Sequence, residues 1–490
     1  MINTVYELIT DVMAKQYPDR VAFRYVAADG KTVVEKTYAQ YVQDIRRAVT
    51  YFKENIPDIK GKRVGIMSRN CYEYGVNSFG AILAGAVVVT INQKKTWPEL
   101  EYEIGLVEPS LILNDGIDYG CRPDIEAAYG DKLRPMDAFK DSAPAELVDC
   151  VGHDDLIVLM FTSGTTGRSK AVMLSERNFF TTVECQVKFG DAMLNYKHEH
   201  MPEDKNDVLS NFAILPLFHL GTFICLFVWA CKGWALNLSA DIRDFYRDLG
   251  LMHSDVMASA PMLVETVYND FKRGRVSRLN GLWDLCCSSA ALDPKMLLEL
   301  AQNGFVVNQC YGMTETFGDG ILNFTQVEKH MSAVGKPDDH VQYKLDETGE
   351  ICIKGDCVML GYYKDPEATA EVIDADGWFH TGDLARMDEE GFYYITGRKK
   401  NLIILASGEN VSPEELEGML EKCPAVQECI VKELGKKIGV VVYCEKEHQQ
   451  TVRDFIAQMN RTVPLYKRIG VVEFSETPLP RNGAGKLVRK

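Results

Sequence analysis

The sequence predicts an α/β protein with a large, multi-layer N-terminal domain of mixed, largely parallel sheets and a small α/β C-terminal domain. Residues 1 to about 150 alternate apolar runs, such as Val21–Val26 and Arg63–Met67, with helix-like stretches. This alternation is typical of parallel strands covered by helices. A basic connector, Gly397–Asn401, precedes a new set of helix and strand signals. We therefore expect two domains, residues 1–397 and 398–490.

Composition restricts the classes of protein. The chain has 490 residues, 46% of them hydrophobic, and a net charge of −16. That charge argues against a nucleic-acid binder, so an anionic ligand would have to be held by a local group of cations and amides. There are fourteen cysteines but no Cys-x-x-Cys pair, and we expect Cys286, Cys287 and Cys310 to be reduced thiols. The predicted compartment is the cytoplasm.

No secretory signal or transmembrane segment is expected. Residues 1–20 lack a basic start followed by an apolar run, and they resemble an amphipathic helix. The best membrane candidate, Phe212–Cys231, has no Asp, Glu, Lys or Arg, but Pro216 and Gly221 interrupt it. We predict a buried strand over Phe212–Leu217 and a buried helix from Gly221. Contact with a membrane through a surface patch stays open.

The remaining elements of the first domain follow from local periodicity and capping. Predicted helices are Thr37–Asn55, Glu73–Gly85 and a helix that begins near Glu176 after the N-cap Ser175. Predicted strands are Ala86–Ile91, Leu156–Phe161 and Ala171–Leu174, followed by a further α/β unit over Asp241–Tyr268. The apolar periodicity of residues 1–150 indicates a hydrophobic core, and we identify no candidate catalytic or binding residue in this segment.

The loop between Leu156–Phe161 and Ala171–Leu174 is the first candidate site. Its glycines, Gly164 and Gly167, let the backbone approach an anion, and Lys170 supplies a charge. Hydroxyl donors come from Thr162, Ser163, Thr165 and Thr166. The spacing differs from the Gly-x-x-x-x-Gly-Lys-Ser/Thr loop, which disfavours a kinase or GTPase. The alternative is a plain hairpin loop.

A second candidate loop, Gln309–Thr316, follows the predicted strand Phe305–Asn308. Tyr311 can stack on a base, Gly312 permits a tight turn, and Thr314 with Glu315 offers oxygen ligands to Mg²⁺. The carboxyl ends of strands are where open α/β sheets bind ligands. The segment Leu282–Leu292 predicts a strand that enters a loop of small residues. An ordinary polar turn is the alternative for Gln309–Thr316.

Two single residues are weaker candidates. His219 follows a predicted strand, where a satisfied core histidine is the more common case. Asp383 could accept both hydroxyls of a ribose, although exposed turn aspartates are more common. Asp319 could meet a polar substrate group, but a loop residue that faces water is the simpler interpretation.

The second domain is predicted from a strong helix start and a strand pair. Ser412, Pro413 and Glu415 suit the N-cap, N1 and N3 positions of a helix. Predicted strands and a helix follow at Val426–Lys432, Ile438–Cys444 and Val452–Met459, before a loop at Pro478–Lys486.

Taken together, the motifs resemble the AMP-forming acyl- and aryl-CoA synthetases, relatives of luciferase and of peptide-synthetase adenylation domains. The resemblance rests on FTSGTTGRSKAV, LPLFH, YGMTE, TGD, GRKKNLIILASGENVSPEELE and PRNGAGK, in that order over nearly the whole chain. It implies the adenylate-forming fold, with ATP and a carboxylic acid bound between a large domain and a small mobile one. It also implies two half-reactions, in which a carboxylate attacks the α-phosphorus of ATP and a thiol then attacks the acyl group.

The resemblance assigns roles to matching residues. It implies that Lys486, Lys170, His219 and Glu315 are catalytic, and that Thr165 or Thr166 binds Mg²⁺ with Glu315. The hinge would be Lys400, and the thiol tunnel would be lined by Gly408 and His219. The implied nucleotide-binding residues are Thr162, Ser163, Gly164, Thr165, Thr166, Gly167, Lys170, Ser288, Ser289, Ala290, Gln309, Cys310, Tyr311, Gly312, Met313, Thr314, Asp383, Ile395, Arg398 and Lys486. In this set Asp383 and Arg398 would hold the ribose.

The sequence departs from the family pattern at two positions. Ser169 stands where the family usually has Pro, and Ala171 where it usually has Gly. Both flank Lys170 and can alter the stiffness of the loop.

The predicted function is an ATP-dependent carboxylic acid:CoA ligase with ATP, Mg²⁺ and coenzyme A, acting on an aliphatic or aryl acid. Phe212-Ala-Ile lacks the Asp typical of amino-acid activators, which disfavours an α-amino substrate. One alternative is a stand-alone ligase that loads an acyl carrier protein. Another is a non-catalytic nucleotide-binding protein, which the presence of Lys486, Glu315 and Asp383 disfavours.

Overall fold

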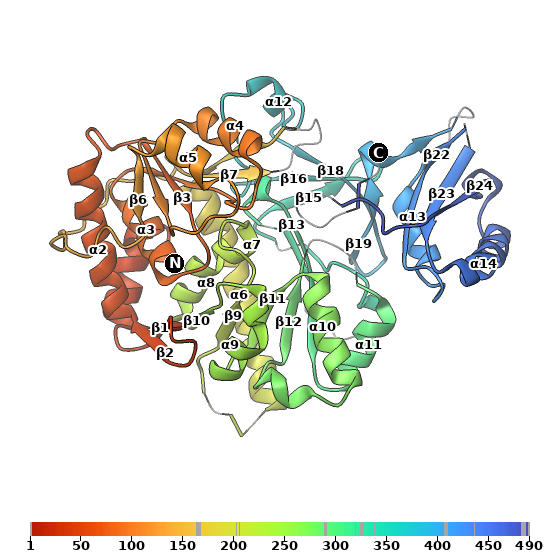
Figure 1. Ribbon diagram of the computed structural model, residues 1–490, viewed down its shortest axis with the longest axis horizontal. Helices are drawn as coiled ribbons and strands as arrows, with labels where there is room; N and C mark the ends of the chain where they lie inside the picture. Colours follow the sequence, from red (N-terminus) through yellow and green to blue (C-terminus); the bar gives the residue numbers. More distant parts are fainter. Residues whose placement is uncertain are drawn as a thin grey trace. The chain divides into compact units, whose positions relative to one another are not determined.

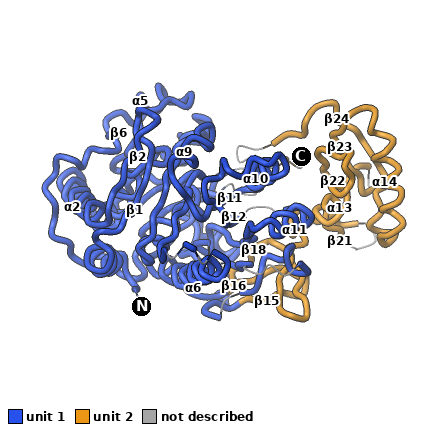
Figure 2. Tube along the Cα trace, turned by 90° about the horizontal axis from the view of Figure 1, so that it is seen from below, with its two compact units in different colours: residues 1–342, 354–377 blue, residues 343–353, 378–490 orange. Residues whose placement is uncertain are grey.

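The chain forms two compact units (Figure 2), which we describe separately. One contains residues 1–342 and 354–377, and the other contains residues 343–353 and 378–490. A computed structural model describes residues 2–162, 168–201, 203–204, 206–288, 292–318, 320–323, 328–337, 339–405, 410–435, 437–481 and 487–488. The domain boundary predicted after Gly397 falls inside the second unit, next to the last residue of a strand. The movement of the small domain about a hinge at Lys400 stays a prediction.

The first unit holds a large mixed sheet with a parallel centre (Figure 1). Its strand order is β14-β13-β12-β11-β9-β10-β1-β2, and only the edge pairs β13–β14 and β1–β2 are antiparallel. The strands are β1 (Val21–Val26), β2 (Val33–Thr37), β9 (Ser210–Ala213), β10 (Ala235–Leu238), β11 (Val256–Ser259), β12 (Asp284–Cys287), β13 (Val306–Gly312) and β14 (Gly320–Asn323).

A second sheet of the first unit carries the glycine-rich hairpin. Its order is β17-β8-β7-β4-β3-β5-β6, parallel from β7 to β6 and antiparallel at the β17–β8 and β8–β7 pairs. The strands are β3 (Arg63–Met67), β4 (Val87–Thr90), β5 (Leu111–Asn114), β6 (Leu133–Pro135), β7 (Leu156–Thr162), β8 (Lys170–Ser175) and β17 (Gly361–Tyr362). All four residues of β4 are buried, as expected for a central parallel strand.

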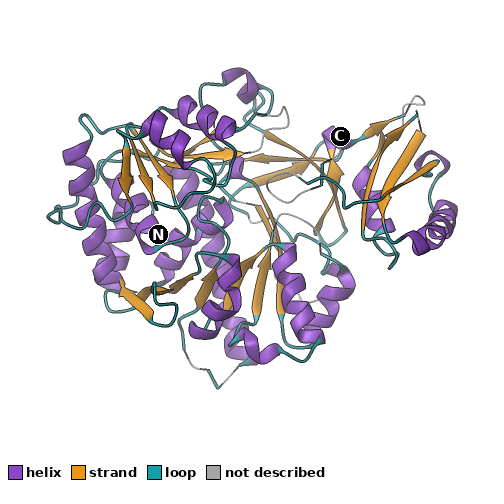
Figure 3. Cartoon of the chain, viewed as in Figure 1, coloured by secondary structure: helices purple, strands orange, loops and turns teal. Residues whose placement is uncertain are grey.

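Helices accompany both sheets (Figure 3), and their starts follow the capping signals. The side chains of Thr37 and Gln40 form a capping box at α2, and Ser175 caps α6 through the amide of Asn178. The first unit contains α1 (Val5–Glu7) continued by a π-helix (Leu8–Gln16), α2 (Tyr38–Asn55), α3 (Tyr72–Leu83), α4 (Trp97–Val107), α5 (Arg122–Tyr129), α6 (Glu176–His200), α7 (Leu220–Phe223), α8 (Cys225–Lys232), α9 (Phe245–Leu251), α10 (Pro261–Lys272), α11 (Pro294–Gln302) and α12 (Pro366–Ala370). Short 3₁₀ turns lie at Ile242–Asp244, Val276–Leu279, Thr314–Thr316 and Glu328–His330.

The described residues of the second unit form three separate sheets, of which the smallest is the antiparallel pair β20–β21. A four-stranded sheet has the order β15-β16-β18-β19, and a three-stranded sheet has the order β22-β23-β24. Its strands are β15 (Gln342–Leu345), β16 (Glu350–Lys354), β18 (Phe379–Met387), β19 (Tyr393–Arg398), β20 (Ile403–Ile404), β21 (Asn410–Val411), β22 (Glu428–Leu434), β23 (Lys437–Tyr443) and β24 (Val471–Ser475). Its helices are α13 (Pro413–Leu420) and α14 (Gln449–Thr462), with 3₁₀ turns at Lys399–Asn401, Lys446–His448 and Leu465–Lys467.

The C-terminal part of the second unit has its own apolar core. Fully buried Leu416 and Leu420 of α13 pack with Val431, Val440 and Val452. The α13 start is as predicted, because Glu415 N donates to Ser412 Oγ at 3.4 Å and Pro413 occupies the first turn.

The strand predicted over Phe212–Leu217 is wrong at its end. The strand β9 stops at Ala213, and the chain then leaves the sheet to contact the side chain of Asn70. Asn70 Nδ2 donates to the carbonyls of Ala213 and Leu215 at 3.1 and 2.9 Å, and Leu217 N donates to Asn70 Oδ1 at 2.8 Å. The buried side-chain amide of Asn70 therefore takes the place of hydrogen bonds to a neighbouring strand.

Among the described residues, no helix is long and apolar enough to cross a membrane.

Glu176, at the start of α6, makes stability depend on pH. Its side chain is fully buried and accepts a hydrogen bond from Val5 N at 2.9 Å, and burial raises its pKa from 4.5 to about 7. Since the folded state holds this proton more tightly than the unfolded chain, stability is lost as the pH rises from 4.5 through 7. We expect Glu176→Gln to raise Tm by about 3 °C at pH 8 and to leave it unchanged at pH 4. Calorimetry tests this, with the exposed Glu199→Gln in the same helix as control; an equal shift at both pH values would contradict it.

Candidate active site

The first group of predicted site residues lies at the β7–β8 hairpin. Thr162 ends β7 and Lys170 begins β8, and the two residues are cross-strand partners. The hairpin therefore holds both ends of the glycine-rich loop in fixed register. The loop residues Ser163, Gly164, Thr165, Thr166 and Gly167 themselves lie outside the described residues.

Lys170 and Glu315 are brought together by a tyrosine that the sequence reasoning missed. Lys170 Nζ lies 4.7 Å from the centroid of the Tyr362 ring, and Tyr362 Oη donates to Glu315 Oε1 at 3.0 Å. Glu315 is only 9% exposed. A cation, a phenol and a carboxylate thus form a chain of contacts at the base of the hairpin. Such a group suits an anion with a bound divalent cation.

The position of Tyr362 follows from local geometry. Gly361 has φ +131°, and a Cβ there would lie 2.8 Å from Thr369 Cγ2. Tyr362 N in turn donates to Thr369 Oγ1 at 2.9 Å, and β17 pairs antiparallel with β8. Only the Gly-Tyr pair in the sequence hints at this turn, because its partner strand lies almost two hundred residues earlier in the chain.

We expect Tyr362→Phe to lower the rate of the first half-reaction about tenfold, because a hydrogen bond to a charged partner is lost. Burial and Glu315 raise the pKa of Tyr362, so its phenol stays protonated above pH 10 and this residue should add no ionisation to the pH–rate profile. Stopped-flow release of pyrophosphate would measure the rate. Tyr363→Phe is the matched control, and an equal effect of both variants would contradict the role of Tyr362.

The second predicted loop is mostly strand. Gln309, Cys310, Tyr311 and Gly312 belong to β13, where they pair with β14, and Met313 precedes the 3₁₀ turn of Thr314 and Glu315. The prediction of a loop over Gln309–Gly312 is therefore wrong, because the non-local partner strand β14 extends the pairing. A Cβ at Gly320 of β14 would lie 1.7 Å from the Tyr311 carbonyl oxygen, so only glycine fits there.

The polar side chains of this region have clear structural partners. Gln309 is buried, accepts from Leu292 N and donates to the Met331 carbonyl. Cys310 Sγ lies 3.1 Å from Cys286 Sγ, and this contact with burial raises the pKa of Cys310. Ser288 follows β12 and its amide donates to the Ser259 carbonyl at 3.3 Å. Ser289, Ala290 and Asp319 lie outside the described residues.

His219 occupies the N-cap position of the short helix α7, but its side chain makes no capping hydrogen bond. Its ring keeps an exposed surface and lies beside Phe218, with ring centroids 4.6 Å apart. Desolvation, and then the positive charges of Lys95 and Lys94, lower the pKa of His219 below 6.5. The imidazole is therefore neutral at physiological pH and adds no positive charge at this point.

In the second unit, Asp383 and Arg398 are a cross-strand pair of β18 and β19. Arg398 Nε lies 2.7 Å from Asp383 Oδ1, and the Asp383 side chain is 7% exposed while that of Arg398 is 46% exposed. Asp383 is thus a buried strand residue, which rules out the exposed-turn interpretation. A buried carboxylate beside an accessible guanidinium can bind vicinal hydroxyls.

Glu350 supports this pair from both sides. Its Oε1 accepts from the amide of Gly382 at 2.8 Å, and its Oε2 lies 2.7 Å from Lys399 Nζ. Gly382 precedes Asp383, and Lys399 follows Arg398.

Of the other predicted residues, Ile395 lies on β19 with 39% exposure and Lys400 is exposed in the 3₁₀ turn after it. Gly408 and Lys486 lie outside the described residues.

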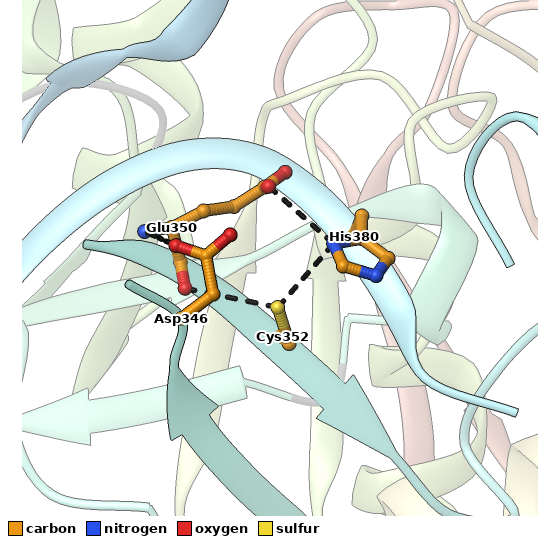
Figure 4. Close-up of side chains that lie close together, drawn as sticks. All are labelled: Asp346, Glu350, Cys352 and His380. Atoms are coloured by element: carbon orange, nitrogen blue, oxygen red, sulfur yellow. Dashed lines mark hydrogen bonds and ion pairs between the residues drawn. The ribbon is translucent and has the colours of Figure 1, made fainter. Parts of the chain in front are cut away.

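Glu350 also belongs to a group with metal-ligating atoms (Figure 4). One atom each of Asp346, Glu350, Cys352 and His380 lies within 4.8 Å of the others, and the figure shows these side chains converging. However, Lys399 Nζ lies 2.7 Å from Glu350 Oε2 and 3.7 Å from Asp346 Oδ2. The ammonium group of Lys399 therefore offsets part of the negative charge of the two carboxylates. Burial raises the pKa of Cys352 to about 11, and the group is a side-chain network around Lys399.

We expect Asp383→Asn to raise KM for ATP about tenfold, because the variant loses the charge that pairs with Arg398 and that the family resemblance assigns to the ribose hydroxyls. The reaction with saturating ATP should change little. Initial rates at varied ATP test this, with the exposed Glu389→Gln as control. An unchanged KM would rule out the ribose-binding role.

The α/β fold and the Lys170–Tyr362–Glu315 group are typical of a nucleotide-using enzyme. The family model of the AMP-binding enzymes matches residues 11–363, and that of the AMP-binding enzyme C-terminal domain matches residues 400–490. The chain therefore belongs to the AMP-binding, adenylate-forming enzymes, and within them to the AMP-forming acid–CoA ligases.

Individual relatives cover almost the whole chain. The chain is 28% identical to 4-coumarate–CoA ligase 3 of Oryza sativa subsp. japonica, over 96% of this chain and 89% of the relative. It is 28% identical to a long-chain-fatty-acid–CoA ligase of Salmonella typhimurium, over 97% and 92%. It is 30% identical to a feruloyl-CoA synthase of Amycolatopsis sp, over 88% of each.

Solved structures confirm the predicted fold. The O-succinylbenzoate coenzyme A synthetase of Bacillus subtilis in complex with AMP is 22% identical with a TM-score of 0.81, over 99% of this chain and 97% of that one. The same enzyme with ATP and a magnesium ion is 23% identical with a TM-score of 0.78, over 99% and 98%. The adenylate-forming α/β fold predicted from the sequence is thus correct.

Proposed function

We propose that the protein is an ATP-dependent carboxylic acid:CoA ligase that acts through an enzyme-bound acyl-adenylate. The observation that carries the proposal is the group of Lys170, Tyr362 and Glu315 at the base of the glycine-rich hairpin. It combines the cation and the carboxylate that a Mg²⁺-bound triphosphate requires. The cross-strand pair Asp383–Arg398 supports a ribose-binding role in the second unit.

In the first half-reaction, a carboxylate oxygen of the acid attacks the α-phosphorus of ATP, and the bond to the bridging oxygen of pyrophosphate breaks. Lys170 would attract the phosphates, while Glu315, with Thr165 or Thr166, would hold Mg²⁺, which neutralises the leaving pyrophosphate when bound. The fit of Mg²⁺ rests on Glu315, a nearly buried carboxylate held by Tyr362. Lys486 would bridge the acid and the α-phosphate.

In the second half-reaction, the thiol sulfur of coenzyme A attacks the acyl carbonyl, and AMP leaves. The lowered pKa of His219 suits a neutral residue beside the acyl group. We propose that the segment after Gly397 moves about Lys400 between the two steps, and that Gly408 and His219 line the path of the thiol.

The acid is proposed to be aliphatic or aryl. Three segments are candidates for the acid pocket, namely Phe218–Phe223, Ala258–Leu263 and Gly312–Gly320, and the first two carry no acidic or basic side chain other than His219. The relatives named 4-coumarate, feruloyl and long-chain-fatty-acid ligases support both kinds of acid. Fourteen cysteines without a Cys-x-x-Cys pair in a chain of this size favour reduced thiols and a cytosolic compartment.

The proposal is tested by pyrophosphate release from ATP and Mg²⁺ with a panel of short, medium, long and aryl carboxylic acids, each with and without coenzyme A. We expect acid-dependent release that yields an acyl-CoA for one class of acid. Release with an acyl-adenylate that coenzyme A does not consume would favour the carrier-protein alternative. No release with any acid would contradict the proposal.

A further inference from the structure

The helix α4 lies against the end of the glycine-rich loop through a lysine just before its first turn. Lys95 Nζ forms an ion pair with Glu103 of α4 and donates to Ser169 Oγ at 3.3 Å. The Glu103 side chain is 0% exposed and that of Lys95 is 20% exposed. Because a buried carboxylate without a cation is costly, Glu103 keeps the ammonium of Lys95 in place beside Ser169.

Further contacts join the same region to both ends of the loop. The Arg168 guanidinium lies 5.5 Å from the ring centroid of Tyr102 in α4, and Lys95 Nζ lies 5.9 Å from that of Phe161 in β7. Thr96 starts α4 with a capping box to Glu99, which fixes the backbone next to Lys95. The residues before and after the loop therefore share one rigid neighbour.

The same helix also reaches the tyrosine side of the site. Lys364 Nζ donates to the Leu106 carbonyl at 3.0 Å and lies 2.7 Å from Glu108 Oε2 at the end of α4. Lys364 follows Tyr362 by two residues, and Ser169 precedes Lys170 by one. The helix thus spans the two strands that present Lys170 and Tyr362 to each other.

By the resemblance described above, Ser169 stands where the family usually has proline. Proline would fix φ near −65° and stiffen the backbone before Lys170, whereas serine leaves that dihedral free. Here the ammonium group of Lys95, which is held by the buried Glu103, donates a hydrogen bond to Ser169. This hydrogen bond restricts the backbone before Lys170 in place of a proline ring. The departure at Ser169 and the charge at Lys95 therefore explain each other.

We infer that Lys95 is a positioning residue that, with Glu103, holds Ser169 and thereby the phosphate-binding end of the hairpin. The inference rests on the proposed function for its kinetic consequences, but not for its structural ones. Its charge is taken up by Glu103, so Lys95 acts on the nucleotide through the hairpin. Loss of the contact should weaken ATP binding and leave the acid unaffected.

The test uses Ser169→Ala, the double variant Lys95→Met/Glu103→Met, which leaves no unpaired buried charge, and Lys94→Met as an exposed control. Loss of one hydrogen bond predicts a rise of about fivefold in KM for ATP for Ser169→Ala, with an unchanged KM for the acid. The double variant should show a similar rise, and adding Ser169→Ala to it should have no further effect. Ser169→Pro in the double variant should restore the KM for ATP. Additive effects, a matching rise in the KM for the acid, or no rescue by proline would overturn the inference.

A measurement without substrates separates this inference from the proposed function. Hydrogen exchange of the amides of Arg168–Ala171 in the whole, nucleotide-free protein should be faster in Ser169→Ala and in the double variant than in the wild type or Lys94→Met. Unchanged exchange would overturn the positioning role even in an active enzyme. If no acid supports pyrophosphate release in the wild type, the proposed function fails while the exchange result still decides the role of Lys95.

Discussion

Glu315→Gln is expected to lower acid-dependent pyrophosphate release on the order of a hundredfold or more, because it removes the negative charge that is proposed to hold Mg²⁺. The amide keeps the size of the side chain and can still accept from Tyr362 Oη, which lies 3.0 Å from Glu315 Oε1. The fold should therefore be preserved, and the dependence of the rate on Mg²⁺ concentration should move to higher concentrations.

The experiment compares Glu315→Gln with the exposed Glu328→Gln over a range of Mg²⁺ concentrations. A rate and a Mg²⁺ dependence equal to those of the wild type would remove Glu315 from the proposed metal site. A lower rate with an unchanged Mg²⁺ dependence would keep Glu315 in the reaction but contradict its role as a metal ligand.

Lys486→Ala should abolish acyl-adenylate formation, with a loss on the order of a hundredfold or more, because it removes the cation that is proposed to bring the acid and the α-phosphate together. ATP binding should be largely intact, since Lys170 and the Asp383–Arg398 pair would remain. The reaction of a chemically prepared acyl-adenylate with coenzyme A should also proceed, because that step does not use the proposed bridge.

Rapid-quench measurement of acyl-adenylate, together with calorimetric ATP titration, would test this prediction. Lys446→Ala, a change at a fully solvated lysine of the same unit, is the control. Unchanged adenylate formation in Lys486→Ala would remove the proposed role, and loss of both half-reactions would point to a structural defect.

Local signals account for the parts of the fold that the sequence predicts well. The helix starts at Ser175 and Ser412 depend on a side chain and an amide three residues away, so a few letters suffice. The strand Val21–Val26 also has the predicted bounds, because its apolar run is a local signal as well. Prediction fails where the local structure depends on a residue far away in the chain. Gln309–Gly312 is a strand because it pairs with β14. Ile214–Leu217 is not a strand because its backbone forms hydrogen bonds with the side chain of Asn70.

The residues of the candidate site also fall into two groups, those with a local sequence signal and those without one. Lys170, Glu315 and Asp383 are visible in the sequence because each belongs to a short motif with a recognisable residue order. Tyr362, Lys95 and Glu350 are not, because each acts on a residue far away in the chain. The contact of Lys95 with Ser169 spans 74 residues and that of Tyr362 with Glu315 spans 47. Single residues in such networks carry no local signal.

The measurement that tests the central claim most directly follows oxygen from the acid into AMP. The enzyme would be given a carboxylic acid labelled with ¹⁸O at both oxygens, together with ATP, Mg²⁺ and coenzyme A, and the products would be weighed by mass spectrometry. Attack of the carboxylate on the α-phosphorus predicts AMP that carries one ¹⁸O atom and pyrophosphate that carries none. Label in inorganic phosphate with formation of ADP, or AMP without label, would contradict the acyl-adenylate.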